Sequence, residues 1–310
     1  MDHLTRSLSN GLVHAAIERA SEFRTRDNEL KELLRQPDSR IIPVSQARNL
    51  IIRREDTPAA AWIAERELPP GEDDLVIFLG MIDGGPCFAL DLESGDRRLA
   101  GLENRGEFLE LHTVGPMLDD RDASILCYAR GICHWHRRHM FCGACGSPTV
   151  AAQGGHVRRC SAADCGISHF PRIDPAIIVL VHSGERCLLG RKPVWPTGRY
   201  STIAGFVEPG EAIEQAVVRE VREETGVAVM EVSYHSSQPW PFPGSVMLGF
   251  HARGDDAREI ELIDGELEDA RWFSRREVGQ ALEKTGPLRL PPGFSIARRL
   301  IEDWYHHAGP

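Results

Sequence analysis

Apolar and polar residues alternate along this chain in short runs that predict strands, interrupted by a few stretches with helical spacing. Residues 75–92 form two apolar runs around Asp83-Gly84-Gly85, which predicts a β-hairpin. Residues 123–139 repeat apolar side chains at helical spacing, and residues 11–35 are compatible with a helix. Further on, the pattern predicts strands at 176–181, 187–190, 200–204, 227–232, 246–251 and 270–273, and helices at 275–284 and 295–306. This mixture predicts an α/β (α+β) fold.

Residues 205–227 carry an unusual arrangement of acidic residues. A Gly/Pro loop at 205–210 leads into a helix that we expect to begin near Glu211 and to end at Gly226, since glycine readily closes a helix. At about 100° per residue, Glu220 and Glu224 share the arc of the apolar residues that must face the core. A Glu-rich helix more often presents a solvated face, but carboxylates directed inward need a cation to offset their burial. Mg²⁺ or Mn²⁺ fits such oxygen ligands.

Four cysteines form two close pairs, Cys142/Cys145 and Cys160/Cys165, separated by fourteen residues. This spacing predicts one tetrahedral Zn²⁺, with Gly154-Gly155 turning a hairpin between the pairs. Four protein ligands leave no open position, so the zinc is expected to be structural. A ribbon that binds nucleic acid or another protein, helped by Arg158 and Arg159, is the alternative for this module. The other cysteines are expected to be buried hydrophobes, and the nearby His134, His136 and His139 surface or capping residues.

The segment 237–245, Ser-Gln-Pro-Trp-Pro-Phe-Pro-Gly-Ser, holds three prolines in five residues. Such a segment cannot be a central strand or a helix, so we expect a stiff, extended loop. Rigid presentation of Trp240 and Phe242 suits stacking on bases. The plainer alternative is that both aromatic side chains fill the core.

Composition narrows the function. The 310 residues carry a net charge of −10, which disfavours broad affinity for phosphate backbones. The N-terminal residues lack the apolar core of a signal peptide, and no stretch approaches about 18 consecutive apolar residues. Eight cysteines in a chain of this length do not suggest a disulfide scaffold. We therefore expect a cytoplasmic protein with no membrane association.

The acidic stretch resembles the Nudix box at every fixed position. Those positions are Gly205, Glu211, Arg219, Glu220, Val221, Glu223, Glu224, Gly226 and Val227. Together with the segment 237–245 and the cysteine pairs, the chain resembles the NADH pyrophosphatase subfamily of the Nudix hydrolases. The resemblance implies a Nudix α/β/α sandwich at 171–310, a helix and zinc ribbon at 126–170, and an N-terminal Nudix-like, dimer-supporting α+β domain at 1–125.

The resemblance also implies roles for single residues. The catalytic set would be Glu211, Arg219, Glu220, Glu223 and Glu224, with Arg219 orienting the carboxylates. The Mg²⁺ or Mn²⁺ ligands would be the carbonyl of Ala204, Glu220, Glu224 and Glu266, although Glu268 is close enough to leave that last choice open. The substrate-binding set would be Phe170, where family members often carry Tyr, with Phe206, Gln238, Pro239, Trp240, Pro241, Phe242, Pro243, Gly244, Ser245 and Ala297.

The activity implied is metal-dependent hydrolysis of the diphosphate of NADH or NAD⁺ to a nicotinamide mononucleotide and AMP, by a homodimer. NAD-capped RNA 5′ ends contain the same scissile bond and are implied as a further substrate. One alternative is a Nudix hydrolase for ADP-ribose or another nucleoside diphosphate derivative. Another is a regulator that uses an inactive Nudix fold as a sensor, against which the intact acids argue.

Overall fold

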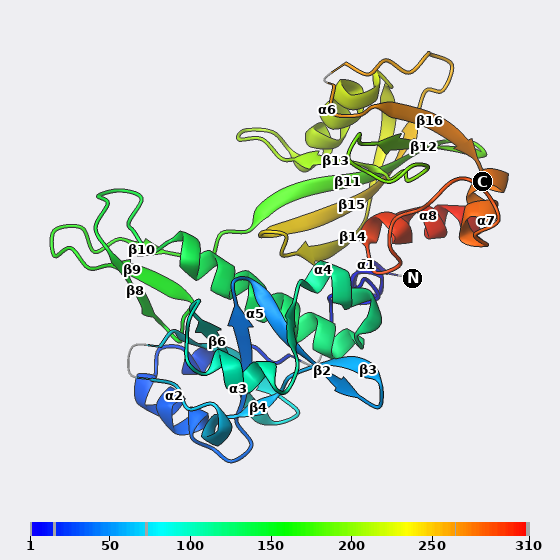
Figure 1. The fold of residues 1–310 in the computed structure, drawn as a ribbon. Helices are drawn as coiled ribbons and strands as arrows, with labels where there is room; N and C mark the ends of the chain where they lie inside the picture. Colours follow the sequence, from blue (N-terminus) through cyan, green and yellow to red (C-terminus); the bar gives the residue numbers. More distant parts are fainter. Residues whose placement is uncertain (1, 15–16, 72–73, 264, 308–310) are drawn as a thin grey trace. The chain divides into compact units, whose positions relative to one another are not determined.

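The computed structural model describes residues 2–14, 17–71, 74–263 and 265–307. The chain forms two compact units (Figure 1). The C-terminal unit comprises Met1–Gly11, Asp174–Pro239 and Ser245–Pro310, and the N-terminal unit comprises Leu12–Ile173 and Trp240–Gly244. The expected domain boundaries near residues 125 and 170 stay a prediction, because compact units need not coincide with domains.

The C-terminal unit is built on a six-stranded sheet in the order β14-β15-β11-β12-β16, with β13 paired to β11. Strand β15 runs parallel to β11, whereas β12 and β13 run antiparallel to it. Its elements are α1 (His3–Leu8), β11 (Asp174–Ser183), β12 (Arg186–Arg191), β13 (Ile203–Phe206), α6 (Ile213–Thr225), β14 (Val229–Trp240), β15 (Ser245–Gly254), β16 (Asp269–Ser274), α7 (Arg275–Leu282) and α8 (Ile296–His306).

Strand β11 shows why helices cover both faces of this sheet. Its side chains alternate between the faces, and all six residues from 176 to 181 are buried. Ile177, Val179 and Val181 pack with Ala216, Val217 and Val221 of α6. Ile178 and Leu180 pack with a second set from α7 and α8, which includes Val278, Leu300 and Trp304. The result is the predicted α/β/α sandwich, with the box helix α6 on one face.

The N-terminal unit holds a seven-stranded sheet, in the order β3-β2-β1-β6-β5 with β4 on β1 and β7 on β2, and a three-stranded sheet β10-β9-β8. Its elements are η1 (Ser21–Phe23), α2 (Asp27–Leu34), β1 (Arg40–Ser45), β2 (Arg48–Arg54), β3 (Thr57–Ala60), β4 (Ile63–Ala64), η2 (Glu65–Glu67), β5 (Val76–Ile82), β6 (Gly85–Leu92), α3 (Leu99–Glu103), β7 (Glu107–Leu109), α4 (Leu111–Val114), η3 (Gly115–Met117), α5 (Asp120–Arg138), β8 (Thr149–Ala152), β9 (Val157–Cys160) and β10 (Ser168–His169).

Most element predictions are confirmed, and two are wrong. The hairpin at 75–92, the helix ending near His139 and the strands around the box all form. The helix expected at 11–35 is confined to α2 and one short 3₁₀ turn, because Leu12 and Ala20 adopt left-handed backbone angles of φ 66° and 43° that no helix accepts. Residues 15–16 lie outside the described residues. In the described ranges, no helix is long and apolar enough to cross a membrane.

The second wrong prediction concerns the proline-rich segment. Residues 237–240 are not loop but the end of β14, and the loop is confined to residues 241–244. Strand β14 lies at the edge of its sheet. An edge strand has one row of backbone groups with no neighbouring strand, so Pro239 fits there without breaking a ladder hydrogen bond.

Candidate active site and zinc centre

The acids of the box are held in place by one arginine. Helix α6 ends at Gly226, which adopts φ 70° as the sequence predicts. On the helix, Arg219 donates from Nη1 to Glu220 Oε1 at 2.8 Å and to Glu223 Oε2 at 3.0 Å. Its other nitrogens donate to both carboxylate oxygens of Glu211, at 2.6 and 3.1 Å. Arg219 therefore orients three carboxylates at once.

The backbone before the helix is shaped to accept the Glu220 carboxylate. A Cβ at position 205 would lie only 1.9 Å from Cδ of Glu220. Glycine is therefore required because a side-chain carboxylate occupies the space that a Cβ would take. Ala204 precedes Gly205 in β13 and pairs with Ile178 of β11. The structure brings Glu220 against the backbone that carries the predicted carbonyl ligand.

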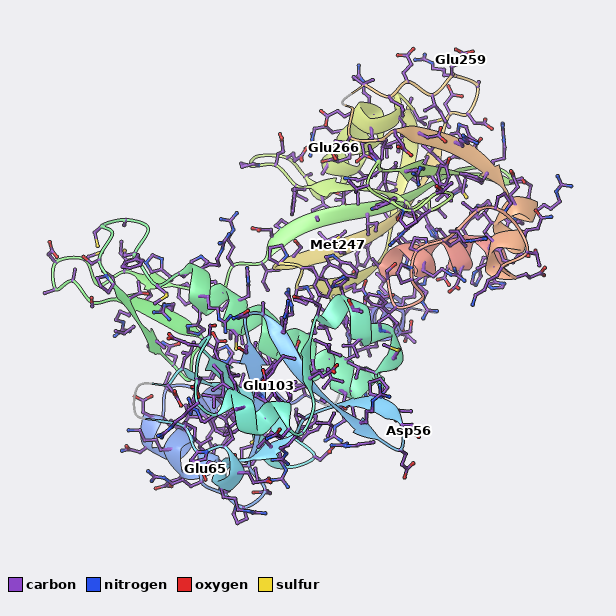
Figure 2. The ribbon with its side chains drawn as sticks, viewed as in Figure 1. Asp56, Glu65, Glu103, Met247, Glu259 and Glu266 are labelled. Atoms are coloured by element: carbon purple, nitrogen blue, oxygen red, sulfur yellow. The ribbon has the colours of Figure 1, made fainter. Side chains whose placement is uncertain are left out.

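The environment of the acids favours a cation. Burial raises the pKa of Glu220 above its ordinary value, against the opposing effect of Arg219, and the charges of Glu223 and Glu266 raise it further. Glu224 is only 2% exposed. Glu266 precedes β16 (Figure 2), and Lys192 Nζ lies 3.0 Å from its Oε2. An oxygen-only set with one buried and one partly buried carboxylate matches what Mg²⁺ and Mn²⁺ prefer.

One residue near the acids, Lys192, was not among the predicted site residues. Lys192 and Glu266 are 74 positions apart and meet because β12 pairs with β16. The same pairing joins Arg191 to Glu268 in an ion pair. The charge of Glu266 raises the pKa of Glu220. The choice between Glu266 and Glu268 as the acid from outside the box stays a prediction.

A groove of about 740 Å³ borders the box helix on its solvent side. Its walls include Arg219 and Glu223 of α6, Val232 of β14 and Ile263. Glu223 is the box acid in this lining, whereas Val217 and Val221 on the same helix pack in the core. The groove therefore borders α6 beside Glu223, and Glu211, Glu220 and Glu224 are not among its lining residues.

The four cysteines form a closed ligand set. Among the described residues, they are the one group of three or more His, Cys, Asp or Glu whose ligand atoms all lie within 4.8 Å of one another. Two of the sulfur–sulfur distances are 3.8 Å (Cys142 to Cys165) and 3.4 Å (Cys145 to Cys160). A tetrahedral site with Zn–S bonds of about 2.3 Å separates its sulfurs by about 3.8 Å. The residues fit a structural zinc.

Hydrogen bonding also prepares this set for a metal. Backbone and side-chain hydrogen bonds from Ser147 lower the pKa of Cys145 to about 6, which favours the thiolate that zinc binds. His169, which sequence reasoning did not single out, places Nε2 3.3 Å from Cys142 Sγ. The remaining cysteines, Cys87, Cys127, Cys133 and Cys187, are all free and buried, as expected.

The histidines at the end of α5 are not all surface residues. His139 caps the helix, as expected. His136 is 1% exposed, so for this residue the surface prediction is wrong. Its Nε2 donates to Gly155 O at 2.7 Å, and its Nδ1 accepts from Arg158 Nη1 at 2.9 Å. Arg158 therefore holds the ribbon hairpin against α5 and is not available to bind a nucleic acid.

Gln238 faces the interior of the C-terminal unit. Its side chain is fully buried, and it donates to the carbonyls of Gly11 and Phe294, both at 2.7 Å. Its Oε1 accepts from Ile296 N at 2.8 Å, at the start of α8. All of these amide contacts are to backbone groups, so Gln238 joins three distant segments. Pro239, next along the strand, is exposed.

Residues 240–244 pack within the N-terminal unit. The Trp240 and Phe242 rings meet edge to face, with centroids 5.1 Å apart. The Arg130 guanidinium lies 4.9 Å from the Phe242 centroid, and Pro241 packs against Gly131 of α5. Phe242 is thus partly buried and has one face covered by a cation. Pro243 is exposed, and Gly244 is half-buried.

The remaining predicted substrate residues differ widely in exposure. Phe170 in the N-terminal unit is 67% exposed, and Phe206 in the C-terminal unit is 58% exposed, so both offer free ring surface. Phe206 pairs with Ala176, which pairs in turn with Met247 of β15. Ser245 begins β15. Ala297 is 4% exposed and packs in the core with Ala204 and Met247, so it supports the sheet from behind.

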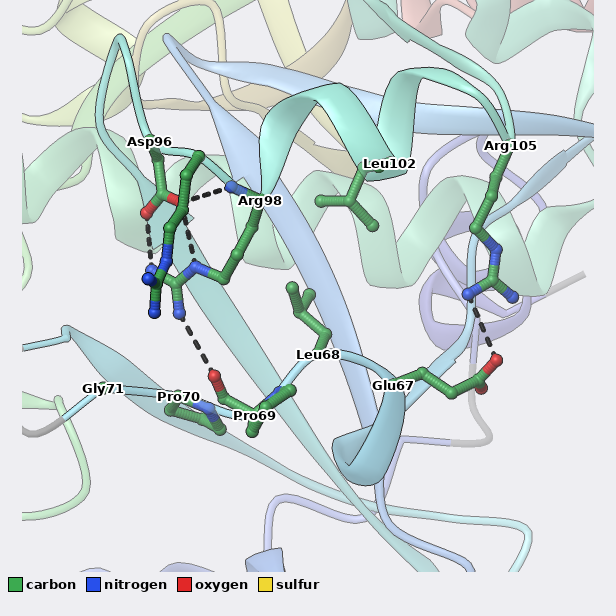
Figure 3. Close-up of a pocket in the computed structure, with 11 residues that line it drawn as sticks. Glu67, Leu68, Pro69, Pro70, Gly71, Asp96, Arg98, Leu102 and Arg105 are labelled. Atoms are coloured by element: carbon green, nitrogen blue, oxygen red, sulfur yellow. Dashed lines mark hydrogen bonds and ion pairs between the residues drawn. The ribbon is translucent and has the colours of Figure 1, made fainter.

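A larger cavity, of about 850 Å³, lies in the N-terminal unit (Figure 3). Leu68 and Leu102 form its apolar wall. Most of its charged lining groups are paired, Arg98 with Asp96 and with the neighbouring Asp74, and Arg105 with Glu67; Arg97 also lines the cavity. Among the described residues, the acids near this cavity do not form a group close enough to bind a metal ion together. Internal pairing makes this cavity a poor candidate for diphosphate chemistry.

Family models match three successive regions. A NUDIX domain matches residues 172–291, an NADH pyrophosphatase zinc ribbon domain residues 137–170, and an NADH pyrophosphatase-like rudimentary NUDIX domain residues 38–135. The sandwich and its acid cluster therefore define a Nudix hydrolase, and the chain is an enzyme of that class.

Proteins of similar sequence identify the family within the Nudix hydrolases. The chain is 37% identical over 276 residues to the NAD-capped RNA hydrolase NudC of Mycobacterium bovis, covering 86% of each chain. It is 43% identical over 242 residues to that of Stutzerimonas stutzeri, covering 78% of this chain and 80% of that one. A solved NUDIX hydrolase from Nitrosomonas europaea is 20% identical over 48% of this chain and 96% of that chain, with a TM-score of 0.39. The chain belongs to the NADH pyrophosphatase (NudC) family of Nudix hydrolases.

Proposed function

We propose that this enzyme hydrolyses the diphosphate linkage of NADH and NAD⁺, releasing a nicotinamide mononucleotide and AMP, and removes NAD caps from RNA 5′ ends. The observation that carries the proposal is the acid cluster of Glu211, Glu220 and Glu223 held by Arg219 above Gly205. Relatives named NAD-capped RNA hydrolase support the choice of substrate.

Glu220, Glu224, Glu266 and the Ala204 carbonyl would hold Mg²⁺ or Mn²⁺. When bound, such ions neutralise diphosphate oxygens and lower the pKa of an attacking water. Gly205 leaves room for the Glu220 carboxylate. Arg219 keeps that carboxylate from turning away, and its contact with Phe206 O at 2.9 Å ties the helix to β13. Glu223, with half of its side chain exposed, lines the groove beside α6.

The exposed ring of Phe206 is proposed to stack on the substrate base, and Phe170 is proposed as a further substrate-binding residue. Phenylalanine keeps a stacking face but offers no hydroxyl, so this contact selects by shape and π surface. Pro239, Trp240, Pro241, Phe242, Pro243, Gly244 and Ser245 are proposed to select the second nucleoside. Gln238 and Ala297 contribute by positioning, since both are buried.

The test is product analysis. Zinc-loaded full-length protein is incubated with Mg²⁺ or Mn²⁺ and, separately, NADH, NAD⁺, ADP-ribose and NAD-capped RNA, and products are identified by chromatography and mass spectrometry. The proposal predicts AMP and a nicotinamide mononucleotide from the dinucleotides and 5′-monophosphate RNA from the capped RNA. Turnover of ADP-ribose alone would instead indicate a general nucleoside diphosphate hydrolase.

We further propose a cytoplasmic homodimer. The dimer rests on the family resemblance, and the compartment rests on four zinc-binding thiols that a reducing environment protects. Light scattering across micromolar concentrations should give about twice the 34.5 kDa of one chain. A mass equal to one chain would remove the dimer from the proposal.

A further inference from the structure

The zinc ribbon exposes large apolar side chains that the proposed catalysis does not use. Met140 is 52% exposed, Phe141 65% and Val150 54%, and all three flank the metal knuckle or its hairpin. Phe141 directly precedes the zinc ligand Cys142. Several exposed apolar residues on so small a module are more than isolated surface hydrophobes, and they indicate an interaction surface.

Strand register places an arginine among them. Phe141 pairs with Pro148, and Val150 pairs with Arg159, which pairs in turn with Ser168 (β8–β10 in Figure 1). Residues directly opposite one another share a face, and so do residues two apart on one strand. Phe141, Val150 and Arg159 therefore share one face of the ribbon sheet. Arg158 lies on the other face, where it is buried.

The charge of this module differs from that of the whole chain. Residues 137–173 hold five arginines and one aspartate, in a protein whose net charge is −10. Zinc with four thiolates adds two negative charges, so the module stays positive. Arg137 is paired with Asp91 and Arg158 is buried, whereas Arg138 and Arg159 are exposed. A locally basic surface on an acidic protein attracts a polyanion.

We propose that this face of the ribbon (Phe141, Val150 and Arg159) binds single-stranded RNA, the part of a capped transcript that follows the cap. An exposed aromatic ring on a small sheet offers a base a stacking platform, and an arginine beside it contacts phosphate. The net positive charge of the module, within a protein of net charge −10, favours a polyanionic partner over a protein partner. The inference rests on the proposed function and extends it from the cap to the RNA.

The test compares two substrates in full-length, zinc-loaded protein. Variants Phe141→Ala and Arg159→Ala are assayed on an NAD-capped single-stranded RNA of about 20 nucleotides and on NADH, with Val194→Ala as the control because Val194 is 86% exposed in the C-terminal unit. Each ribbon variant should lower kcat/KM for the RNA by roughly five- to a hundredfold and leave NADH hydrolysis unchanged. Phe141→Trp should restore RNA turnover, because it restores a stacking surface.

Direct binding separates this proposal from the proposed function. The Kd for the same RNA with a 5′-hydroxyl and no cap should rise in both ribbon variants, and Arg159→Ala should reduce the salt slope of log Kd by about 0.7. That result stands even if the wild-type enzyme does not cleave caps, which would sink the proposed function alone. Unchanged RNA affinity in both variants overturns the inference. Equal losses on RNA and NADH, or a change of oligomeric state without a change in RNA affinity, overturn it as well. Zinc content and melting temperature are measured on every variant.

Discussion

The zinc ribbon and the Nudix box each depend on one arginine, but the two arginines have opposite kinds of partner. Arg158 in the ribbon donates to neutral acceptors: Thr149 Oγ1 and O, both at 2.7 Å, and His136 Nδ1 at 2.9 Å. Arg219 in the box donates mainly to the carboxylates of Glu211, Glu220 and Glu223. One arginine holds the scaffold around a metal site, and the other holds charges that belong to the site itself.

The ligand sets differ in the same sense. The four cysteine sulfurs already lie within 4.8 Å of one another, and Arg158 touches none of the ligands. Within the described residues, the carboxylate oxygens of the box acids do not form a group that lies within 4.8 Å of one another. Arg219 forms an ion pair with Glu220. A structural metal needs a closed set that never opens, whereas a catalytic one must admit ions and substrate in each cycle. Arg219, a cation supplied by the protein itself, keeps the acids ordered and so suits a catalytic site that must admit ions and substrate.

The largest effect should come from removing charge in the box. Glu220→Gln and Glu224→Gln keep the side-chain shape but remove a metal-ligand charge, so kcat with saturating Mn²⁺ should fall by roughly two to four decades. The melting temperature should stay close to that of the wild type for Glu220→Gln, whose side chain is only partly buried. Steady-state kinetics on NADH and thermal unfolding measure both.

Glu214→Gln is the matched control, because Glu214 lies on the same helix but is exposed. Its turnover should equal that of the wild type. Near-normal turnover in both ligand variants would show that the box acids are structural, and the contrast between the two arginines would lose its meaning.

In the ribbon, the same kind of substitution should act on stability instead of turnover. Cys145→Ser removes one of four zinc ligands, and zinc binding in such modules contributes folding free energy directly. A loss of several kcal/mol would lower the melting temperature by roughly 10 °C. Elemental analysis should find about one Zn²⁺ per wild-type chain and less in the variant. Ser161→Ala, at an exposed hydroxyl of the ribbon, is the control. A variant that keeps its zinc and its melting temperature would contradict the structural assignment.

Sequence reasoning succeeded where the local pattern determines the structure. The apolar run at 176–181, the glycine at 226 and the cysteine spacing each specify an element or ligand set on their own. They led to β11, the end of α6 and the four-sulfur cluster. Nine fixed positions of the box did the same for the acids and their arginine.

It failed where distant segments decide the outcome. Nothing near Gln238 indicates that its amide reaches Gly11 and Phe294, which lie 227 and 56 residues away. The prolines around it suggested a loop because sequence does not reveal that β14 is an edge strand. Likewise, His136 looks like part of a solvated basic run until Arg158 and Gly155 are folded around it.

A smaller effect should distinguish substrate selection from fold support. Trp240→Ala removes an aromatic contact and should lower kcat/KM for NADH by roughly ten- to a hundredfold. The loss on ADP-ribose, which lacks the nicotinamide half, should be smaller. Because Trp240 packs on Phe242, the melting temperature must be shown to hold. Equal losses on both substrates would mean that the segment supports the fold alone.

The smallest effect tests the neutral partner of Arg158. Burial lowers the pKa of His136 to about 4, against the raising effect of its bond to Gly155. Nδ1 of His136 accepts a hydrogen bond from the Arg158 guanidinium, so a proton on Nδ1 would break this bond and place two positive charges side by side. The unfolded imidazole takes up its proton near pH 6.5, so between pH 6.5 and 4 the unfolded state binds more protons, and stability falls as pH falls. From pH 7.5 to 5.5 this group should cost about 1.3 kcal/mol of unfolding free energy.

In His136→Gln, the amide can accept from Arg158 and donate to Gly155 without titrating, so urea unfolding should show a loss smaller by that amount. His306→Gln, at an exposed histidine, is the control substitution. Protonation of the zinc thiolates affects all three proteins alike and cancels in the comparison. Equal pH dependence in wild type and His136→Gln would show that His136 titrates normally, and the neutral clamp would have to be abandoned.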